Sequence, residues 1–507
     1  MNQKTLSFLI IFVLCLAVAS CYFETTDDGL SDELSEYFYT RTETGDDERF
    51  PFLGFDLSSG RITASDDHHI FRSINKPFEE IALTTFNKYK KYAEHHRNIV
   101  ETSLDKSSFV HKRYITTYPF EWTSGMIKDA FLFNLKLALD LKKYGLLLID
   151  PAPNNTVFDY TRPVFVDFGG ILADDFSPKY VNRITNEEWK RYILDIEERE
   201  PEIFQKFAKA FVLLSYGKYD LARKMLMNRH RMYILGKNVE DNADIVQSVK
   251  THKLKTHTLS DDLYRSLIKK VEAISVSASP HQFNYNYYKN KNENFDFKDR
   301  KNWKQKQNSI YEILNRYKPE TVIDIGCNTG WFSILAERTG ARVISIDSDE
   351  AVVDYLYQYS KEHNLNILPL KINFENLDKK YYVKIGSDCE FSETCKNVAL
   401  YAAPILRLKS DMTFCLALVH HLVLHFGMSA EKVMNILARI TRKVLVLEVP
   451  SLDQVILSNL SYYRYARDIK KENYGVECFI NEGKKYFKKF RIYPSTPESR
   501  TIIVFEK

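Results

Sequence analysis

The sequence reads Val322-Ile-Asp-Ile-Gly-Cys-Asn-Thr-Gly-Trp-Phe-Ser333 at the point that decides its fold. Hydrophobic, largely β-branched residues lead into Gly326 and Gly330, and an amphipathic run continues to Arg338. A second hydrophobic run then ends at Asp347. This order predicts a strand, a tight glycine turn, a helix and a second strand with an acid at its end. Open α/β sheets hold nucleosides in this way, because glycines let the backbone approach the ligand and a carboxylate receives ribose hydroxyls.

The spacing of the glycines distinguishes this turn from other nucleotide-binding turns. Dinucleotide sites use three glycines in the pattern G-x-G-x-x-G, whereas here three residues separate Gly326 from Gly330 and no P-loop lysine follows. The pattern D-x-G-x-x-x-G, with an acid 17 to 21 residues after the glycines, resembles the class I S-adenosylmethionine-dependent methyltransferases. The resemblance implies that Asp324 lies near the methionine end of the cofactor and that Asp347 binds its ribose hydroxyls. A glycine turn in an ordinary α/β domain is the alternative.

Strands and helices continue to alternate towards the end of the chain. The expected elements are a helix at 303–316 before the motif, a helix at 349–363, strands at 367–372, 412–419 and 443–448, and an antiparallel pair at 491–493 and 500–505. This alternation predicts an α/β fold, with a C-terminal Rossmann-like methyltransferase domain built on a mainly parallel sheet. Ligands of such sheets bind outside the carboxyl ends of the strands.

Polar residues cluster at these predicted strand ends. They are Asp324, Asp347, Asn373, His420, His421 and Glu448. Asn373 stands where many methyltransferases carry an acid towards the adenine amino group, and its amide oxygen can accept the same hydrogen bond. The cofactor-binding residues expected from the resemblance are Asp324, Gly326, Cys327, Asn328, Gly330, Asp347 and Asn373.

The pair His420 and His421 follows the predicted strand at 412–419. In the methyltransferase fold, the end of this strand faces the transferred methyl group, and a neutral imidazole there can take the proton of the acceptor. We therefore take both histidines as candidate catalytic residues, although methyl transfer needs mainly positioning and a base is optional. A structural pair that hydrogen-bonds neighbouring loops is the alternative. Glu448 and Arg407 are candidate substrate-side groups, with a solvated strand end and a surface arginine as their alternatives.

A closer resemblance rests on several short segments. Leu416-Ala-Leu-Val-His-His-Leu422, Leu445-Val-Leu-Glu-Val-Pro450 and Ser499-Arg-Thr501 resemble a group of two-part, bacterial-type methyltransferases related to a host-specific nodulation protein. Members carry Y-P-[FY]-E-W-[ST] ahead of a D-A-x-x-x-N element, and Tyr118-Pro-Phe-Glu-Trp-Thr123 and Asp150-Pro-Ala-Pro-Asn-Asn155 fit these patterns. The resemblance covers roughly residues 105–507 and leaves the methyl acceptor unidentified.

The first half of the chain carries a kinase-like pattern. Asp150 and Asn155 are followed by Asp167-Phe-Gly169, and protein kinases arrange a catalytic base and two Mg²⁺ ligands in this order. A glycine-rich phosphate loop and a lysine on a convincing strand are missing from the sequence before it. We interpret this half as a degenerate α+β kinase-like domain that binds substrate or supports the methyltransferase. The alternatives are an active phosphotransferase, with Asn155 and Asp167 as metal ligands, and residues that only cap turns.

Length and composition are those of a globular protein with two or three domains. The chain has 507 residues, 44% hydrophobic and 27% charged, and its net charge of +4 is too small for this size to imply a nucleic-acid partner. The expected division is a signal peptide or membrane anchor at 1–21, an acidic flexible segment and truncated N-lobe-like region at 22–104, the kinase-like domain at 105–280, a linker at 281–300 and the methyltransferase domain at 301–507.

The N-terminus predicts export or membrane attachment. Lys4 precedes an apolar run, and the small residues before Cys21 resemble a cleavage site at which Cys21 becomes lipidated, although an uncleaved anchor is also open. Export conflicts with a cytosolic cofactor, so a misassigned start would place the protein at the cytoplasmic face. Cys389 and Cys395 are a candidate disulfide. An exported binding protein without catalysis is therefore a third hypothesis, and the oligomeric state is open.

Overall fold

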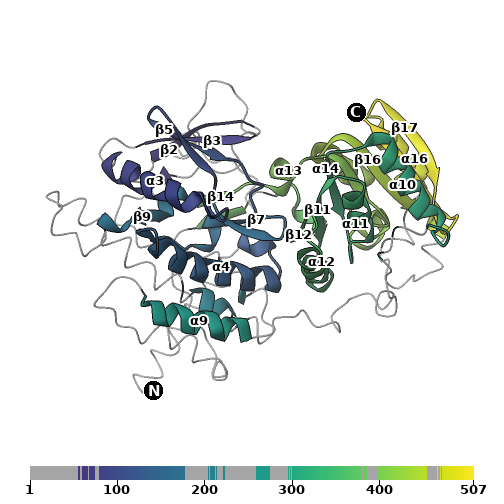
Figure 1. Cartoon of the computed structure of the whole chain (residues 1–507). Coiled ribbons are helices and arrows are strands. Elements are labelled where there is room, and N and C mark those ends of the chain that lie inside the picture. Colours follow the sequence, from purple (N-terminus) through teal and green to yellow (C-terminus); the bar gives the residue numbers. More distant parts are fainter. Residues whose placement is uncertain are drawn as a thin grey trace, which may run out of the picture.

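The computed structural model of this chain describes most of both halves (Figure 1). The described residues are 55–56, 60–66, 68–74, 79–176, 259–273, 300–379, 381–384, 398–453 and 471–507, with scattered residues in 204–226, 295–297 and 465–469. The predictions for the leader, Cys21, most of the linker, Cys389 and Cys395 lie outside this part of the chain. Among the described residues, no helix is both long and apolar enough to cross a membrane.

The C-terminal half is built on a seven-stranded sheet with the order β12-β11-β10-β15-β16-β18-β17. Its strands are β10 (Thr321–Ile325), β11 (Arg342–Asp347), β12 (Ile367–Lys371), β15 (Ser410–Cys415), β16 (Thr441–Pro450), β17 (Lys489–Pro494) and β18 (Arg500–Glu506). The five strands from β12 to β16 pair in parallel, whereas β18 is antiparallel to both β16 and β17. The predicted mainly parallel sheet and its closing antiparallel pair are confirmed.

Both faces of this sheet are covered, which explains why its strands read as nearly continuous hydrophobic runs. Val322 and Val343 point into one core, together with residues of α10 (Gln305–Tyr317) and α11 (Trp331–Arg338). Ile323 and Ile344 belong to the other core, which includes residues of α14 (Ala430–Ile440). Helix α12 (Glu350–Glu362) packs against β11 and β12 and also against the N-terminal half.

The N-terminal half combines an antiparallel sheet with helices. Its five-stranded sheet has the order β1-β2-β3-β5-β4, formed by β1 (Phe55–Asp56), β2 (Gly60–Ser65), β3 (His69–Ser73), β4 (Thr102–Asp105) and β5 (Ser108–Lys112). This half also contains α3 (Glu79–Ala93), the short helical turn η3 (Pro119–Glu121), α4 (Ser124–Lys142), α9 (Asp261–Ala273), and the hairpin of β7 (Thr156–Asp159) and β8 (Arg162–Phe165). In Figure 1 this half and the C-terminal sheet are two bodies, between which α12 lies close to α4.

Two predicted strand ends were wrong. β15 ends at Cys415, because Ala417 adopts a positive φ of 54° that a strand cannot accommodate. His420 therefore precedes a π-helical turn, His421–His425, instead of ending a strand. β16 extends to Pro450, so Glu448 lies within the strand and its side chain is fully buried.

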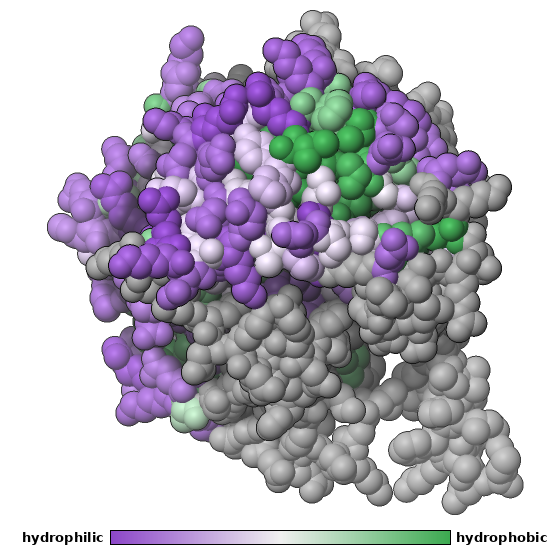
Figure 2. Space-filling model, turned by 90° about the vertical axis from the view of Figure 1, so that its right-hand side faces the viewer, coloured by the Kyte–Doolittle hydropathy of each residue, from purple (hydrophilic) through white to green (hydrophobic). Residues whose placement is uncertain are grey.

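Strand β17 forms one edge of the C-terminal sheet. Its Phe490 and Ile492 are 38% and 56% exposed. Figure 2 views the molecule from the side at which β17 lies in Figure 1, and it shows a compact hydrophobic area surrounded by hydrophilic surface. β17, which carries Phe490, and β12 lie at opposite edges of the sheet.

Candidate active site

The glycine turn between β10 and α11 is held in a conformation that suits glycine. Gly326, Asn328 and Gly330 have φ values of 76°, 52° and 87°. A Cβ atom on Gly330 would lie 2.4 Å from Cδ1 of Leu356, and one on Gly326 would lie 3.2 Å from Cδ2 of Leu418. Glycines therefore allow both the left-handed backbone and the close packing behind the turn.

Asp347 at the end of β11 ties the turn to the neighbouring strand. Its Oδ2 accepts a hydrogen bond of 3.0 Å from the backbone N–H of Asn328, and its Oδ1 accepts one of 3.0 Å from the N–H of Asp349. Desolvation raises the pKa of this carboxyl group above its ordinary value. A carboxylate has about four lone-pair positions, so these two bonds leave capacity for ribose hydroxyls.

Asp324 is buried within β10, one residue before its end. Its Oδ2 accepts a hydrogen bond of 2.7 Å from the hydroxyl of Ser333, which lies in the first turn of α11. Burial raises the pKa of Asp324 to about 6. This carboxyl group thus fixes the start of α11 relative to β10. Burial also raises the pKa of the Cys327 thiol, so this side chain is protonated at neutral pH and packs in the turn.

A cavity of about 300 Å³ lies beside the end of β11 and β12. It is lined by Phe120, Glu121, Ser348, Lys371, Ile372, Asn373, Asn376 and Pro404. Ser348 directly follows Asp347, and Asn373 follows β12, so the cavity adjoins the predicted cofactor residues. Asn373 also begins a short helical turn, because its Oδ1 accepts a bond of 3.3 Å from the N–H of Glu375.

The two candidate histidines lie against each other on the turn that follows β15. Their ring centroids are 4.1 Å apart, and His420 is buried. Burial lowers the pKa of His421 to about 4 and that of His420 further, with the charges of Arg500 and Lys306 adding to the effect on His420. Both imidazoles are therefore neutral at pH 7.

Glu448 and Arg407 are buried, so the alternatives of a solvated strand end and a surface arginine were wrong. Glu448 forms an ion pair of 2.6 Å with Lys306 of α10 and accepts a hydrogen bond of 2.5 Å from Ser495. Arg407 instead joins the two halves of the chain. It pairs with Glu121, and its Nε donates to the carbonyl of Ala402 at 3.1 Å.

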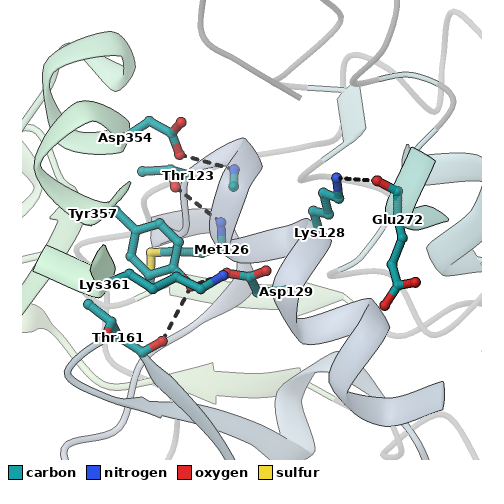
Figure 3. Close-up of polar contacts among 10 residues, drawn as sticks. Thr123, Met126, Lys128, Asp129, Thr161, Glu272, Asp354, Tyr357 and Lys361 are labelled. Atoms are coloured by element: carbon teal, nitrogen blue, oxygen red, sulfur yellow. Dashed lines mark hydrogen bonds and ion pairs between the residues drawn. The ribbon is translucent and has the colours of Figure 1, made fainter. Parts of the chain in front are cut away.

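A second joint connects α4 with α12 (Figure 3). The N–H of Gly125 donates to Oδ1 of Asp354 at 3.0 Å, and the hydroxyl of Tyr357 donates to Asp129 at 2.5 Å. Lys361 forms an ion pair of 2.5 Å with the same Asp129. Because Tyr118-Pro-Phe-Glu-Trp-Thr123 directly precedes α4, this motif is a docking segment between the halves.

The kinase-like residues occupy a separate place in the N-terminal half. Asp167 pairs with Arg72 of β3 at 3.2 Å. The amide of Asn155 donates to the carbonyl of Asp150 at 3.0 Å, and Asp150 accepts from the N–H of Ala152 at 3.3 Å. Asp150 and Asn155 therefore stabilise a turn, whereas Asp167 is neutralised by an arginine. Among the described residues, no group of three or more His, Cys, Asp or Glu side chains is placed to hold a metal ion.

Arg72 was missed from the sequence. The sequence offers no lysine on a convincing strand in this region, and the strand around Arg72 has only five residues and gives little periodic signal. The pairing partner lies 95 residues further along the chain. No local signal in the sequence distinguishes Arg72 from the other lysines and arginines ahead of the Asp-Phe-Gly element.

Comparisons with known proteins agree with this fold. The family model "Tellurite resistance protein TehB" matches residues 287–390. The chain is 23% identical over 414 residues to the nodulation protein NoeA of Rhizobium meliloti (strain 1021). The matched region covers 77% of this chain and 80% of NoeA.

Two solved structures are also similar to part of the chain. The bifunctional kinase-methyltransferase WbdD is 15% identical with a TM-score of 0.27, and the match covers 39% of this chain and 38% of WbdD. The magnesium protoporphyrin IX methyltransferase ChlM from Synechocystis PCC 6803, solved with bound SAH, is 16% identical with a TM-score of 0.27, over 39% of this chain and 81% of ChlM. The chain thus spans about two fifths of WbdD.

The parallel sheet, the glycine turn with its acids and the family match all point to the same class. The resemblance drawn from the sequence is confirmed. The C-terminal half is thus similar to the class I methyltransferases, whose cofactor is S-adenosylmethionine.

Proposed function

We propose that the protein transfers a methyl group from S-adenosylmethionine to an acceptor bound near the turn that carries His420 and His421. The observation that supports this most strongly is the hydrogen bond between Asp347 and the N–H of Asn328. It joins the carboxylate to a turn whose glycines bring backbone close to a ligand. In this proposal Gly326, Cys327, Asn328 and Gly330 form the backbone cradle, and Asp347 receives the ribose hydroxyls.

When bound, the cofactor supplies an electrophilic methyl group on a sulfonium. The protein's own contribution is to place the acceptor in line with that group and to exclude water. His421 is neutral at pH 7 because burial holds its pKa at about 4. An imidazole with this pKa is a weak base, so its role is to accept a hydrogen bond from the acceptor and orient its lone pair. His420 supports the same turn from a buried position.

The kinase-like part has a supporting role in this proposal. The ion pair between Arg72 and Asp167 occupies the carboxylate that would bind Mg²⁺ in an active phosphotransferase. Attachment to a membrane through residues 1–21, or export, remains our prediction for location, and no nucleic-acid partner is proposed.

The test is transfer of a tritium-labelled methyl group from S-adenosylmethionine into fractionated native extract. We expect label in one acceptor class with the wild-type protein and at least about tenfold less with Asp347→Ala, since a hydrogen-bonded carboxylate contributes about 1.5–3 kcal/mol. Asp105→Ala, at an exposed position in β4, is the matched control and should transfer label normally. Equal labelling by Asp347→Ala and wild type would contradict the site assignment.

A further inference from the structure

The cavity beside Asp347 has walls from both halves of the chain. Six of its eight lining residues come from the C-terminal half, and Phe120 and Glu121 come from η3 in the N-terminal half. At the ends of β11 and β12 the lining residues Ser348, Lys371 and Asn373 are polar, whereas Ile372 is apolar. Phe120 is the one aromatic side chain among the eight.

The position of this cavity makes it the pocket for the adenine of the cofactor, an assignment that rests on the proposed function. Asp347 receives the ribose in that proposal, and Ser348 continues directly from it into the cavity wall. Asn373, expected from the sequence to meet the adenine amino group, lies in the same wall. A purine has polar edges and apolar faces. The polar side chains of the wall can hydrogen-bond its edge, and an apolar side chain is needed to pack against its face.

Phe120 offers such a surface and is held in place. Its ring stacks on Tyr118, with centroids 5.4 Å apart and planes inclined by 16°. The hydroxyl of Tyr118 accepts a hydrogen bond of 3.2 Å from the N–H of Ala402 in the C-terminal half. The guanidinium of Arg407 lies over the same Tyr118 ring at 4.6 Å. The stack is therefore anchored across the joint between the halves.

Glu121 completes this anchor. Its Oε2 accepts a bond of 3.0 Å from the N–H of Tyr118, and its Oε1 pairs with Arg407. Arg407 also donates to the carbonyl of Thr116 at 2.5 Å. These bonds fix the turn that carries Phe120 relative to the C-terminal half, which places its partly exposed ring at the cavity.

We propose that Phe120 packs against the adenine ring of bound S-adenosylmethionine, so that the kinase-like half completes the cofactor pocket of the methyltransferase half. Aromatic side chains stack on nucleobases because every base presents a flat π surface. The kinase-like part is then needed for cofactor affinity, and its docking through Arg407 is coupled to cofactor binding.

The experiment is calorimetric titration of the full-length protein with S-adenosylhomocysteine. We expect Phe120→Ala to weaken binding about 5- to 150-fold, the range that removal of a base-stacking aromatic produces. Phe120→Tyr keeps the ring and should bind within about threefold of wild type. The control Phe490→Ala removes an aromatic side chain from β17, at the far edge of the sheet, and should bind normally.

The outcomes separate this inference from the proposed function. Wild-type protein that fails to bind S-adenosylhomocysteine would overturn both. If wild type binds and Phe120→Ala binds equally well, the role of Phe120 is refuted while the cofactor assignment stands. Equal losses in Phe120→Ala and Phe120→Tyr would also refute stacking, because the ring is retained in the second variant. Thermal unfolding of the unliganded variants checks that each is folded.

Discussion

Replacing Gly330 by alanine should cost more stability than any other glycine-to-alanine change of similar backbone conformation in the C-terminal half. Gly330 has a φ of 87°, which costs a residue with a Cβ about 1–2 kcal/mol. The new Cβ would also lie 2.4 and 2.6 Å from the two terminal carbons of Leu356. Leu356 is fully buried in the core with α10 and α11 and cannot swing into solvent. Overpacking of this kind costs about 1–3 kcal/mol.

Gly340 is the matched control for the backbone term. It has a φ of 102°, but a Cβ there would meet no atom within 4 Å. Gly340→Ala should therefore lose only about 1–2 kcal/mol, whereas Gly330→Ala should lose about 2–5 kcal/mol. Urea unfolding, followed by circular dichroism with the unfolding slope compared between variants, gives both values.

Leu356→Ala isolates the steric term. Alone it should cost about 2–5 kcal/mol through the cavity it leaves. Combined with Gly330→Ala, it removes the atoms that the new Cβ would strike, so the double variant should be about 1–3 kcal/mol more stable than the sum of the single losses predicts. Strictly additive losses, or equal losses for Gly330→Ala and Gly340→Ala, would refute this reasoning.

Three further predictions concern ionisable side chains. Arg407→Met leaves Glu121 buried without its cation and should destabilise the protein by about 3–5 kcal/mol in urea unfolding; a loss below about 1 kcal/mol would contradict the joint. The folded pKa of His421, about 4, lies below its ordinary value of 6.5, so the unfolded chain binds more protons and stability should fall as pH drops from 6.5 towards 4. This slope should flatten in His421→Asn. Asp167→Ala removes the ion pair with Arg72, and neither residue lines the cavity. The affinity for S-adenosylhomocysteine should therefore stay within about twofold of wild type, measured by calorimetry. A loss of about tenfold would disprove this prediction.

The parts of the fold that sequence predicted well are those set by neighbouring residues. The order of β10, the glycine turn, α11 and β11 follows from hydrophobic runs and two glycines within 322–347, and each element agrees with the structure within a few residues. The end of β15 was misplaced because hydrophobic residues continue beyond it. Leu416 and Val419 are buried off the sheet, and only the positive φ of Ala417 ends the strand.

The joint between the halves could not be predicted from local pattern. Arg407 and Glu121 are separated by 286 residues, and the sequence pattern around neither residue predicts a buried ion pair. The motif at 118–123 was recognised, but its place between the halves depends on long-range contacts. For the same reason Phe120 was not among the cofactor residues expected from the sequence, since it reaches the cavity from the other half of the chain.

The most direct measurement of the central claim is equilibrium binding of S-adenosylhomocysteine to the wild-type protein and to Asp347→Ala. We expect saturable binding at one site per chain in the wild type and a loss of at least about tenfold in affinity in the variant, because the variant lacks the carboxylate that receives the ribose hydroxyls. Absence of binding to the folded wild type, or equal affinity of the two proteins, would contradict the assignment of the glycine turn and Asp347 as the cofactor site.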